Sequence, residues 1–277
     1  MAYALDPRSC IAKFKRAKTH LDDLKAVLNL ERQTHPNTGT AIAKFDPKTG
    51  YYVVRIATMP EEFLLECGII AGDCISNLRG ALDHLVWQLA LVASDGQVPV
   101  NPKRISFPTY EFARTKRFPG GRERRGFDGA EIVKQIGTTD RATLARFQPY
   151  RGGHGKKLAA LDRMWNEDKH RTLVRLRVTS SGWTNWDPRA FDPETWDESN
   201  IDFEMVDYDH RHTAKWAEIG AEIMRFRVVP MPKNKIEVET THSGAVNLSD
   251  LGPAVEALGV LAESVRAVLV AFSVEPA

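Results

Sequence analysis

Apolar residues recur at intervals of three and four in four long segments of the chain, a pattern that predicts amphipathic helices. We place these helices within residues 6–33, 60–93, 155–179 and 249–273. The second has the longest apolar stripe, made of Ile75, Leu78, Leu82, Leu85, Leu89 and Val92. Each helix keeps a polar face for solvent, so the stripes are expected to pack together as a helical bundle.

Strands are predicted where β-branched and aromatic residues alternate with polar ones. Residues 41–57 predict a hairpin whose turn is Asp46–Gly50. A strand-rich insertion at residues 183–246 predicts a small antiparallel layer of three strands. These strands are placed at residues 201–206, 215–229 and 235–241.

The fold class that follows is α+β. We expect a four-long-helix bundle with an inserted β-hairpin and a small antiparallel sheet before the last helix. A chain of 277 residues can bury such a core as one large domain or as two small ones, and we assign residues 1–277 to a single domain. The bundle would comprise residues 6–93, 155–179 and 249–273.

Charge is unevenly distributed along the chain, although the net charge at pH 7 is only +2. The segment 99–126 is rich in Pro and Gly, predicts a loop or lid, and carries eight basic residues against two acidic ones. Residues 183–222 reverse the sign, with eleven acidic residues against three basic ones. This asymmetry predicts a basic surface for an anionic partner, two segments that attract each other, or two solvated loops.

The three cysteines do not suggest a disulfide framework. Cys67 and Cys74 lie on the same predicted helix, which puts their Cα atoms about 10 Å apart, too far for a disulfide. The N-terminus has no signal segment, and no apolar run reaches the length of a membrane span. We therefore expect a cytoplasmic protein that does not contact a membrane.

The most unusual stretch of the second predicted helix is Asn77-Leu78-Arg79-Gly80-Ala81-Leu82-Asp83-His84, where ionisable side chains interrupt an apolar sequence. At about 100° per residue, Arg79 and Asp83 fall on one flank of the apolar stripe, whereas Asn77 and His84 fall on the other. Arg79 and His84 therefore diverge. They could act together only in a groove that a second helix or a second subunit closes.

A second polar stretch, Asn166-Glu167-Asp168-Lys169-His170-Arg171, lies in the third predicted helix. The apolar stripe of that helix has Asp168 as its next member, so a carboxylate occupies a position that the pattern assigns to the core. An unpaired buried carboxylate is strongly destabilising. We therefore expect the two helices to pack together, with Arg79 or His84 as the partner of Asp168. The same packing would bring His170 and Arg171 close to this cluster.

The spacing from Arg79 to His84, an Arg followed after four residues by a His, resembles the signature of the HEPN superfamily. Its members are helical bundles, many of them metal-independent ribonucleases that place two such motifs at a dimer interface. The resemblance implies that Arg79 and His84 are catalytic, with Asp83 or Asp168 orienting the His. In that chemistry a His moves the proton of a ribose 2′-hydroxyl, and an Arg stabilises charge on the phosphate.

The partner implied by this resemblance is RNA, in a setting of toxin or phage-defence biology. The chain is also similar to uncharacterised phage and actinobacterial proteins that carry a comparable Leu-Arg-x-Ala-Leu-Asp-His and Asp-Lys-His-Arg pair. The expected substrate-binding residues are Asn77, His170, Arg171, Arg122, Arg124 and Arg125.

Two alternatives stay open from the sequence. In the first, Arg79 and Asp83 form an ion pair, His84 is a hydrogen-bond donor between helices, and the protein is a non-catalytic interaction module. In the second, Glu167 and His170 form the Glu-x-x-His pair that binds metal in ferritin-like bundles. No second copy of that pair is found, so we assign no metal ligand and no cofactor. A single divalent ion held by Asp83, His84, Asp168 and His170 stays open as an alternative.

Small residues on the second predicted helix favour the close approach of another helix. The face opposite the main apolar stripe carries Ser76, Gly80, Asp83 and Trp87. Either the final helix of the same chain or a second subunit is expected to cover this face, and only the second arrangement brings two Arg79-His84 motifs together. Because closed two-fold dimers are the commonest soluble assembly, we predict a homodimer.

Overall fold

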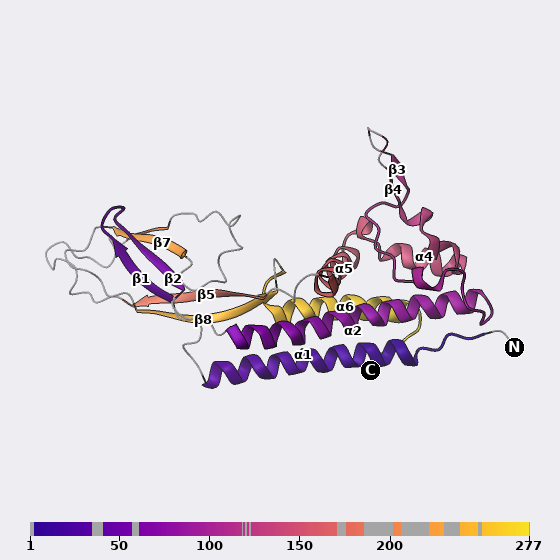
Figure 1. The fold of residues 1–277 in the computed structure, drawn as a ribbon, viewed down its shortest axis with the longest axis horizontal. Coiled ribbons are helices and arrows are strands. Elements are labelled where there is room, and N and C mark those ends of the chain that lie inside the picture. The colour runs from indigo at the N-terminus through magenta and orange to yellow at the C-terminus, as the bar shows by residue number, and fades with distance from the viewer. Residues whose placement is uncertain are drawn as a thin grey trace. The chain divides into compact units, whose positions relative to one another are not determined.

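The computed structural model describes residues 3–34, 41–56, 61–117, 119, 121, 123–170, 176–185, 202–205, 222–229, 239–248 and 251–276. These residues form helices and small antiparallel sheets, which confirms the α+β class (Figure 1). The helices are α1 (Arg8–Thr34), α2 (Glu61–Ala93), α3 (Glu131–Lys134), α4 (Thr138–Arg146), α5 (His154–His170) and α6 (Ala254–Ala271), with short 3-10 helices at Pro102–Arg104, Phe127–Gly129 and Pro149–Arg151. The strands are β1 (Ala41–Asp46), β2 (Tyr51–Ile56), β3 (Lys116–Arg117), β4 (Glu123–Arg124), β5 (Leu176–Asn185), β6 (Asp202–Met205), β7 (Glu222–Val229) and β8 (Glu239–Leu248).

The chain divides into two compact units. The first consists of residues 1–26, 66–175 and 254–277, and the second of residues 27–65 and 176–253. The first unit is mainly helical. The second gathers the predicted hairpin and the strand-rich insertion, which are far apart in the sequence.

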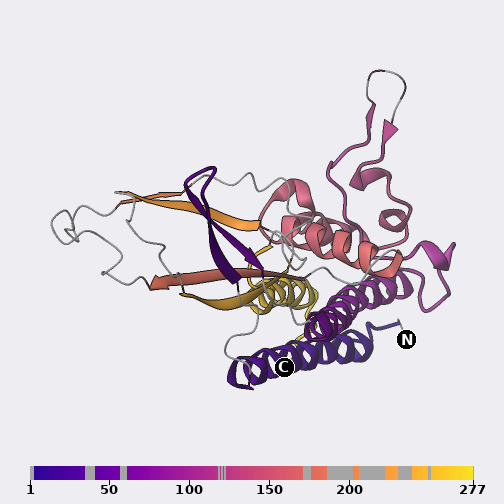
Figure 2. The same cartoon turned by 60° about the vertical axis from the view of Figure 1, so that its left-hand side comes forward.

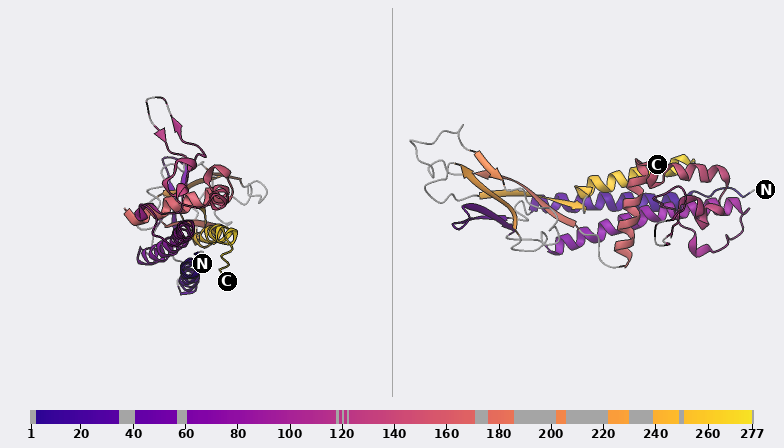
Figure 3. Two further views of the ribbon diagram at one scale, coloured as in Figure 1. Left: turned by 90° about the vertical axis from the view of Figure 1, so that its right-hand side faces the viewer. Right: turned by 90° about the horizontal axis from the view of Figure 1, so that it is seen from above.

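The predicted apolar stripe of α2 forms the core of the first unit. Ile75, Leu78, Leu82 and Leu85 are at most 1% exposed, which agrees with the three-four periodicity that predicted them. α1, α2 and α6 run alongside one another, whereas α5 crosses them (Figures 1 and 3). The four long helices therefore do not all align as the sequence pattern suggested.

The second unit contains two sheets (Figure 2). The predicted hairpin is confirmed, because β1 pairs with β2 in antiparallel register around the turn after Asp46. β2 continues into β7 and then β6, giving the strand order β1-β2-β7-β6. The expected layer of three insertion strands is wrong in one respect, because β8 pairs with β5 in a separate sheet.

The strand β5 also corrects the predicted end of the third helix. We expected that helix to continue to residue 179, but α5 ends at His170 and an extended strand begins at Leu176. Antiparallel pairing with β8 joins Leu176 to Leu248 and Val178 to Val246. Cross-strand pairing of β-branched residues thus outweighs a helical period that is also compatible with this short apolar run.

Between α2 and α5, the chain forms short helices and one narrow two-stranded ribbon. β3 and β4 pair through Lys116 with Arg124 and Arg117 with Glu123. The ribbon stands out from the helices of its unit (Figures 1 and 2). The expected loop or lid at residues 99–126 is therefore partly a β-ribbon. No helix in the described part of the chain is long and apolar enough to cross a membrane.

Candidate functional site

Arg79 is the most constrained charged residue of the site. Its side chain is only 4% exposed, and its guanidinium contacts groups on α2, on α5 and in the segment that contains Phe107. Nη1 lies 2.7 Å from Oδ1 of Asp162 on α5, and Nη2 donates a hydrogen bond of 2.8 Å to the carbonyl of Phe107. Nε lies 3.2 Å from Oδ1 of Asp83, one turn further along α2. The guanidinium also lies over the ring of Trp165, 5.3 Å from its centroid.

Asp83 completes this arrangement from the α2 side. Its Oδ1 accepts a hydrogen bond of 2.7 Å from the backbone N–H of Phe107, the residue whose carbonyl Arg79 binds. Burial raises the pKa of the Asp83 carboxyl, Arg79 and the N–H of Phe107 oppose the shift, and nearby Asp162 adds to it. Arg79 and Asp83 therefore fix both backbone polar groups of one residue.

Asp162, which the sequence analysis did not single out, is the interhelical partner of Arg79. Its second oxygen accepts a hydrogen bond of 3.0 Å from the hydroxyl of Thr109. The available signal was the spacing of Leu158, Asp162 and Trp165, which follows the same three-four rule as the stripe chosen instead. The stripe that contains Asp168 lies next to this one on the same helix.

Gln148 holds the next part of the same segment. Its side chain is fully buried, and its Nε2 donates hydrogen bonds to the carbonyls of Pro108, at 2.9 Å, and Leu144, at 3.3 Å. Its Oε1 accepts a hydrogen bond of 3.0 Å from the N–H of Tyr110. Residues 107–110 are thus held through backbone groups by α2 and Gln148, and through the Thr109 hydroxyl by α5. We call this arrangement the segment clamp.

His84 lies on the other flank of α2, as helix geometry predicted. The flank is marked by Asn77, whose Oδ1 lies 3.5 Å from Nζ of Lys13, and by Gln88, which accepts a hydrogen bond from the N–H of Asp6. His84 itself is half-buried, and no hydrogen bond or ion pair to it is found among the described residues. The structure does not bring Arg79 and His84 together.

Asp168 lies against Gly72 of α2, so the predicted packing of the two helices is confirmed. A Cβ atom on Gly72 would lie 2.9 Å from Oδ1 of Asp168. The expected pairing of Arg79 with Asp168 is wrong, because Asp162, almost two turns earlier on α5, takes that place.

The side chains of three predicted substrate-binding residues, His170, Arg171 and Arg122, are not among those that the structure describes. His170 ends α5, and only its backbone is described. Arg171 and Arg122 lie outside the described residues. Arg124 ends β4 and Arg125 follows it directly, and both side chains are exposed.

Gly80 bears on the predicted homodimer. A Cβ atom there would lie 3.4 Å from Cδ of Lys13, so α1 of the same chain occupies the space that this small residue leaves. We expected a second subunit or the final helix at this position. The close approach instead involves α1 and needs no partner chain.

Two positions that the sequence raised as metal ligands are Glu167 and His170. Among the residues with described side chains, no group of three or more His, Cys, Asp or Glu could hold a metal ion.

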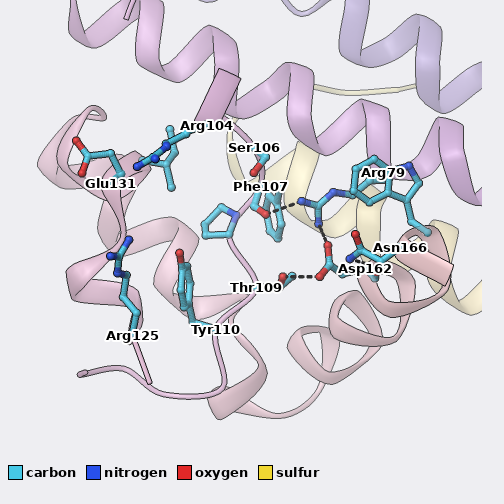
Figure 4. Close-up of a pocket in the computed structure, with 13 residues that line it drawn as sticks. Arg79, Arg104, Ser106, Phe107, Thr109, Tyr110, Arg125, Glu131, Asp162 and Asn166 are labelled. Atoms are coloured by element: carbon cyan, nitrogen blue, oxygen red, sulfur yellow. Dashed lines mark hydrogen bonds and ion pairs between the residues drawn. The ribbon is translucent and has the colours of Figure 1, made fainter. Parts of the chain in front are cut away.

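A pocket of about 400 Å³ opens beside the segment clamp (Figure 4). Arg104, Glu131 and Arg125 stand on one side of it, and Arg79, Asp162 and Asn166 on the other. The remaining lining residues are Ser106, Phe107, Pro108, Thr109, Tyr110, Ile132 and Trp165.

Comparison with known protein families, curated proteins and solved structures finds no match for this chain.

Proposed function

We propose that the protein binds single-stranded RNA through the ribbon of β3 and β4 and its flanking residues, which we call the basic arm (residues 112–128). The observation that supports this proposal is the exposure of its cations. The described ones are Arg114, Lys116, Arg117, Arg124 and Arg125, all exposed. A projecting strand pair that carries cations can follow the phosphate backbone of a nucleic acid. Contacts between cationic side chains and phosphates dominate the affinity of proteins for nucleic acids.

The neighbouring acidic residues neutralise these cations only weakly. Arg124 lies 2.9 Å from Glu111, and Arg117 lies 3.7 Å from Glu123, but all four side chains are more than half exposed. Ion pairs in water contribute little and exchange readily for other anions. The positive charge of the arm therefore stays available to phosphates.

The base of the arm is rigidly attached, which supports a binding role. The N–H groups of Phe127 and Asp128 donate to the carbonyls of Phe112 and Ala113. Gly126 must be Gly here, because a Cβ atom would collide with the backbone of Arg114. We assign Arg79, Asp83 and Asp162, which we call the Arg79 cluster, a structural role, because the segment clamp holds the residues that lead into the arm.

The experiment compares two triple charge reversals by fluorescence anisotropy with a labelled single-stranded RNA. The arm variant is Lys116→Glu, Arg117→Glu and Arg124→Glu. The matched control is Lys15→Glu, Arg16→Glu and Lys18→Glu, three exposed cations of α1 that make the same change in net charge. If all three arm cations contact phosphates, the arm variant should lower the slope of log K against log salt by about 2, whereas the control should leave it unchanged. Equal losses in both variants would contradict the proposal.

A HEPN-like, metal-independent ribonuclease is the second candidate function. The observation in its favour is His84, whose imidazole is half-buried and has no partner among the described residues. An unpaired imidazole can accept a proton from a ribose 2′-hydroxyl. Arg79 would have to act from a second copy of the chain, because the two side chains of one chain diverge.

The test is RNA cleavage in EDTA by the parent protein and by His84→Ala. His84→Ala removes no described hydrogen bond, so lost cleavage with an unchanged melting temperature would support catalysis. Arg79→Ala is a poor test, because it removes the segment clamp as well. Cleavage that survives in His84→Ala would contradict the ribonuclease proposal and leave RNA binding by the arm unaffected.

A further inference from the structure

The pocket beside the segment clamp has two uncompensated cations on one wall. Arg104 and Arg125 both line it, and neither has an ion-pair partner among the described residues. Glu131 lines the same wall, and among the described residues no ion pair joins it to either Arg. Two guanidinium groups that face a shared space without a carboxylate partner favour an anion with several oxygens, above all a phosphate.

The rest of the pocket is suited to hydroxyl groups. Glu131, Ser106, Thr109 and Tyr110, whose side chains all carry oxygen atoms, line the same pocket. A carboxylate is the usual acceptor for a pair of sugar hydroxyls beside a phosphate. The combination of two Arg with one Glu therefore favours a small molecule that carries a phosphate group and neighbouring hydroxyl groups.

The wall of this pocket is preorganised. The segment clamp fixes the backbone of residues 107–110, which form its floor, through Asp83, Arg79 and Gln148. The stem of Arg125 packs on Gly129, where a Cβ atom would lie 3.3 Å from its Cγ. A pocket of about 400 Å³ also has the size of sites for small ligands. Rigid walls lower the entropic cost of binding a small ligand.

We propose that this pocket binds a phosphomonoester carried next to sugar hydroxyls. Two sources share this chemistry, a free sugar phosphate and the 5′-phosphorylated end of an RNA strand. The proposal does not depend on RNA binding by the basic arm.

The test uses isothermal titration with ribose 5-phosphate, ribose and inorganic phosphate. We expect ribose 5-phosphate to bind about tenfold more tightly than either fragment, because only it engages both the guanidinium groups and Glu131. Arg104→Ala and Arg125→Ala should each weaken binding about tenfold or more. Lys103→Ala is the matched control, because it removes an exposed cation from the same segment without touching the pocket.

The arm variant separates the two sources and keeps this inference apart from the proposed function. In that variant, tighter binding of a 5′-phosphorylated than of a 5′-hydroxyl oligoribonucleotide would identify the strand end. Equal binding of the two strands, with ribose 5-phosphate still bound, would identify the free sugar phosphate. The inference is overturned if ribose 5-phosphate does not bind, or if Lys103→Ala weakens its binding as much as Arg104→Ala does.

Discussion

The guanidinium of Arg79 and the carboxylate of Asp162 lie 2.7 Å apart and join α2 to α5 beside the segment clamp. Arg79→Met would leave the carboxylates of Asp162 and Asp83 and the carbonyl of Phe107 without this partner. Removal of one member of a buried ion pair is expected to lower the free energy of unfolding by about 3–5 kcal/mol. Urea denaturation followed by circular dichroism measures this loss.

Arg8→Met is the matched control, because Arg8 pairs with Asp6 in solvent, and its side chain is 89% exposed. An exposed ion pair contributes little to stability, so this variant should unfold like the parent. Equal free energies of unfolding for Arg79→Met and Arg8→Met would show that the Arg79 cluster does not hold residues 107–110 in place.

Two glutamines with buried amide groups offer a second comparison. Gln148→Leu removes hydrogen bonds to Pro108, Tyr110 and Leu144, so we expect a loss of about 1–3 kcal/mol. Gln135 is the opposite case, because its buried amide oxygen and nitrogen have no hydrogen-bond partner among the described residues. Gln135→Met should therefore leave stability unchanged or raise it by about 1 kcal/mol.

Thermal unfolding compares the stabilities of the parent, Gln148→Leu and Gln135→Met. Hydrogen exchange at the backbone amide of Tyr110 monitors the hydrogen bond to Gln148 directly. Exchange there should accelerate in Gln148→Leu alone. A loss of stability in Gln135→Met equal to that in Gln148→Leu would contradict the assignment of the clamp to Gln148.

The helices were predictable because their signal is local. Three-four periodicity located the long helices, and the buried residues Leu78 and Leu82 lie where the period places them. The divergence of Arg79 from His84 also followed from helix geometry alone. Such features depend only on residues a few positions apart.

The segment clamp and the sheet pairing depend on contacts between residues that are far apart in the sequence. Hydrophobic periodicity does not indicate which of several possible partners such residues contact. Gln148 lies in a segment without periodicity, so nothing marked its side chain as the one that would bind the backbone of Tyr110. Asp162 and Asp168 are similar carboxylates six positions apart on one helix, and only the crossing of α5 over α2 decides which meets Arg79. β8 likewise pairs with β5, and this choice of partner could not be inferred from the residues of β8 alone.

Two helical glycines differ in the space around them, which gives opposite predictions. At Gly155 in α5, a Cβ atom would collide with the backbone carbonyl of Gln148. At Gly259 in α6, nothing lies within 4 Å of the corresponding position. Gly259→Ala should raise the free energy of unfolding by about 0.5–1 kcal/mol, the difference in helix propensity. Gly155→Ala should lower it by more than that, and a stabilising effect at both positions would disprove the close contact.

The three cysteines are buried, and none forms a disulfide. Burial raises the pKa of the Cys74 thiol to about 12 and that of the Cys10 thiol to about 11. The thiolate is the reactive form, so an aromatic disulfide reagent at pH 8 should not modify the native protein, whereas all three thiols should react in denaturant.

Because these two pKa values are higher in the native than in the unfolded state, the unfolded chain releases protons first as the pH rises above about 9. The stability contributed by the two protonated thiols is complete below that pH and decreases as the pH rises towards 11 and 12. Cys10→Ala combined with Cys74→Ala should therefore make the alkaline loss of stability shallower than in the parent. Rapid modification of the native protein, or an unchanged alkaline slope in the double variant, would show that the thiols are not buried as described.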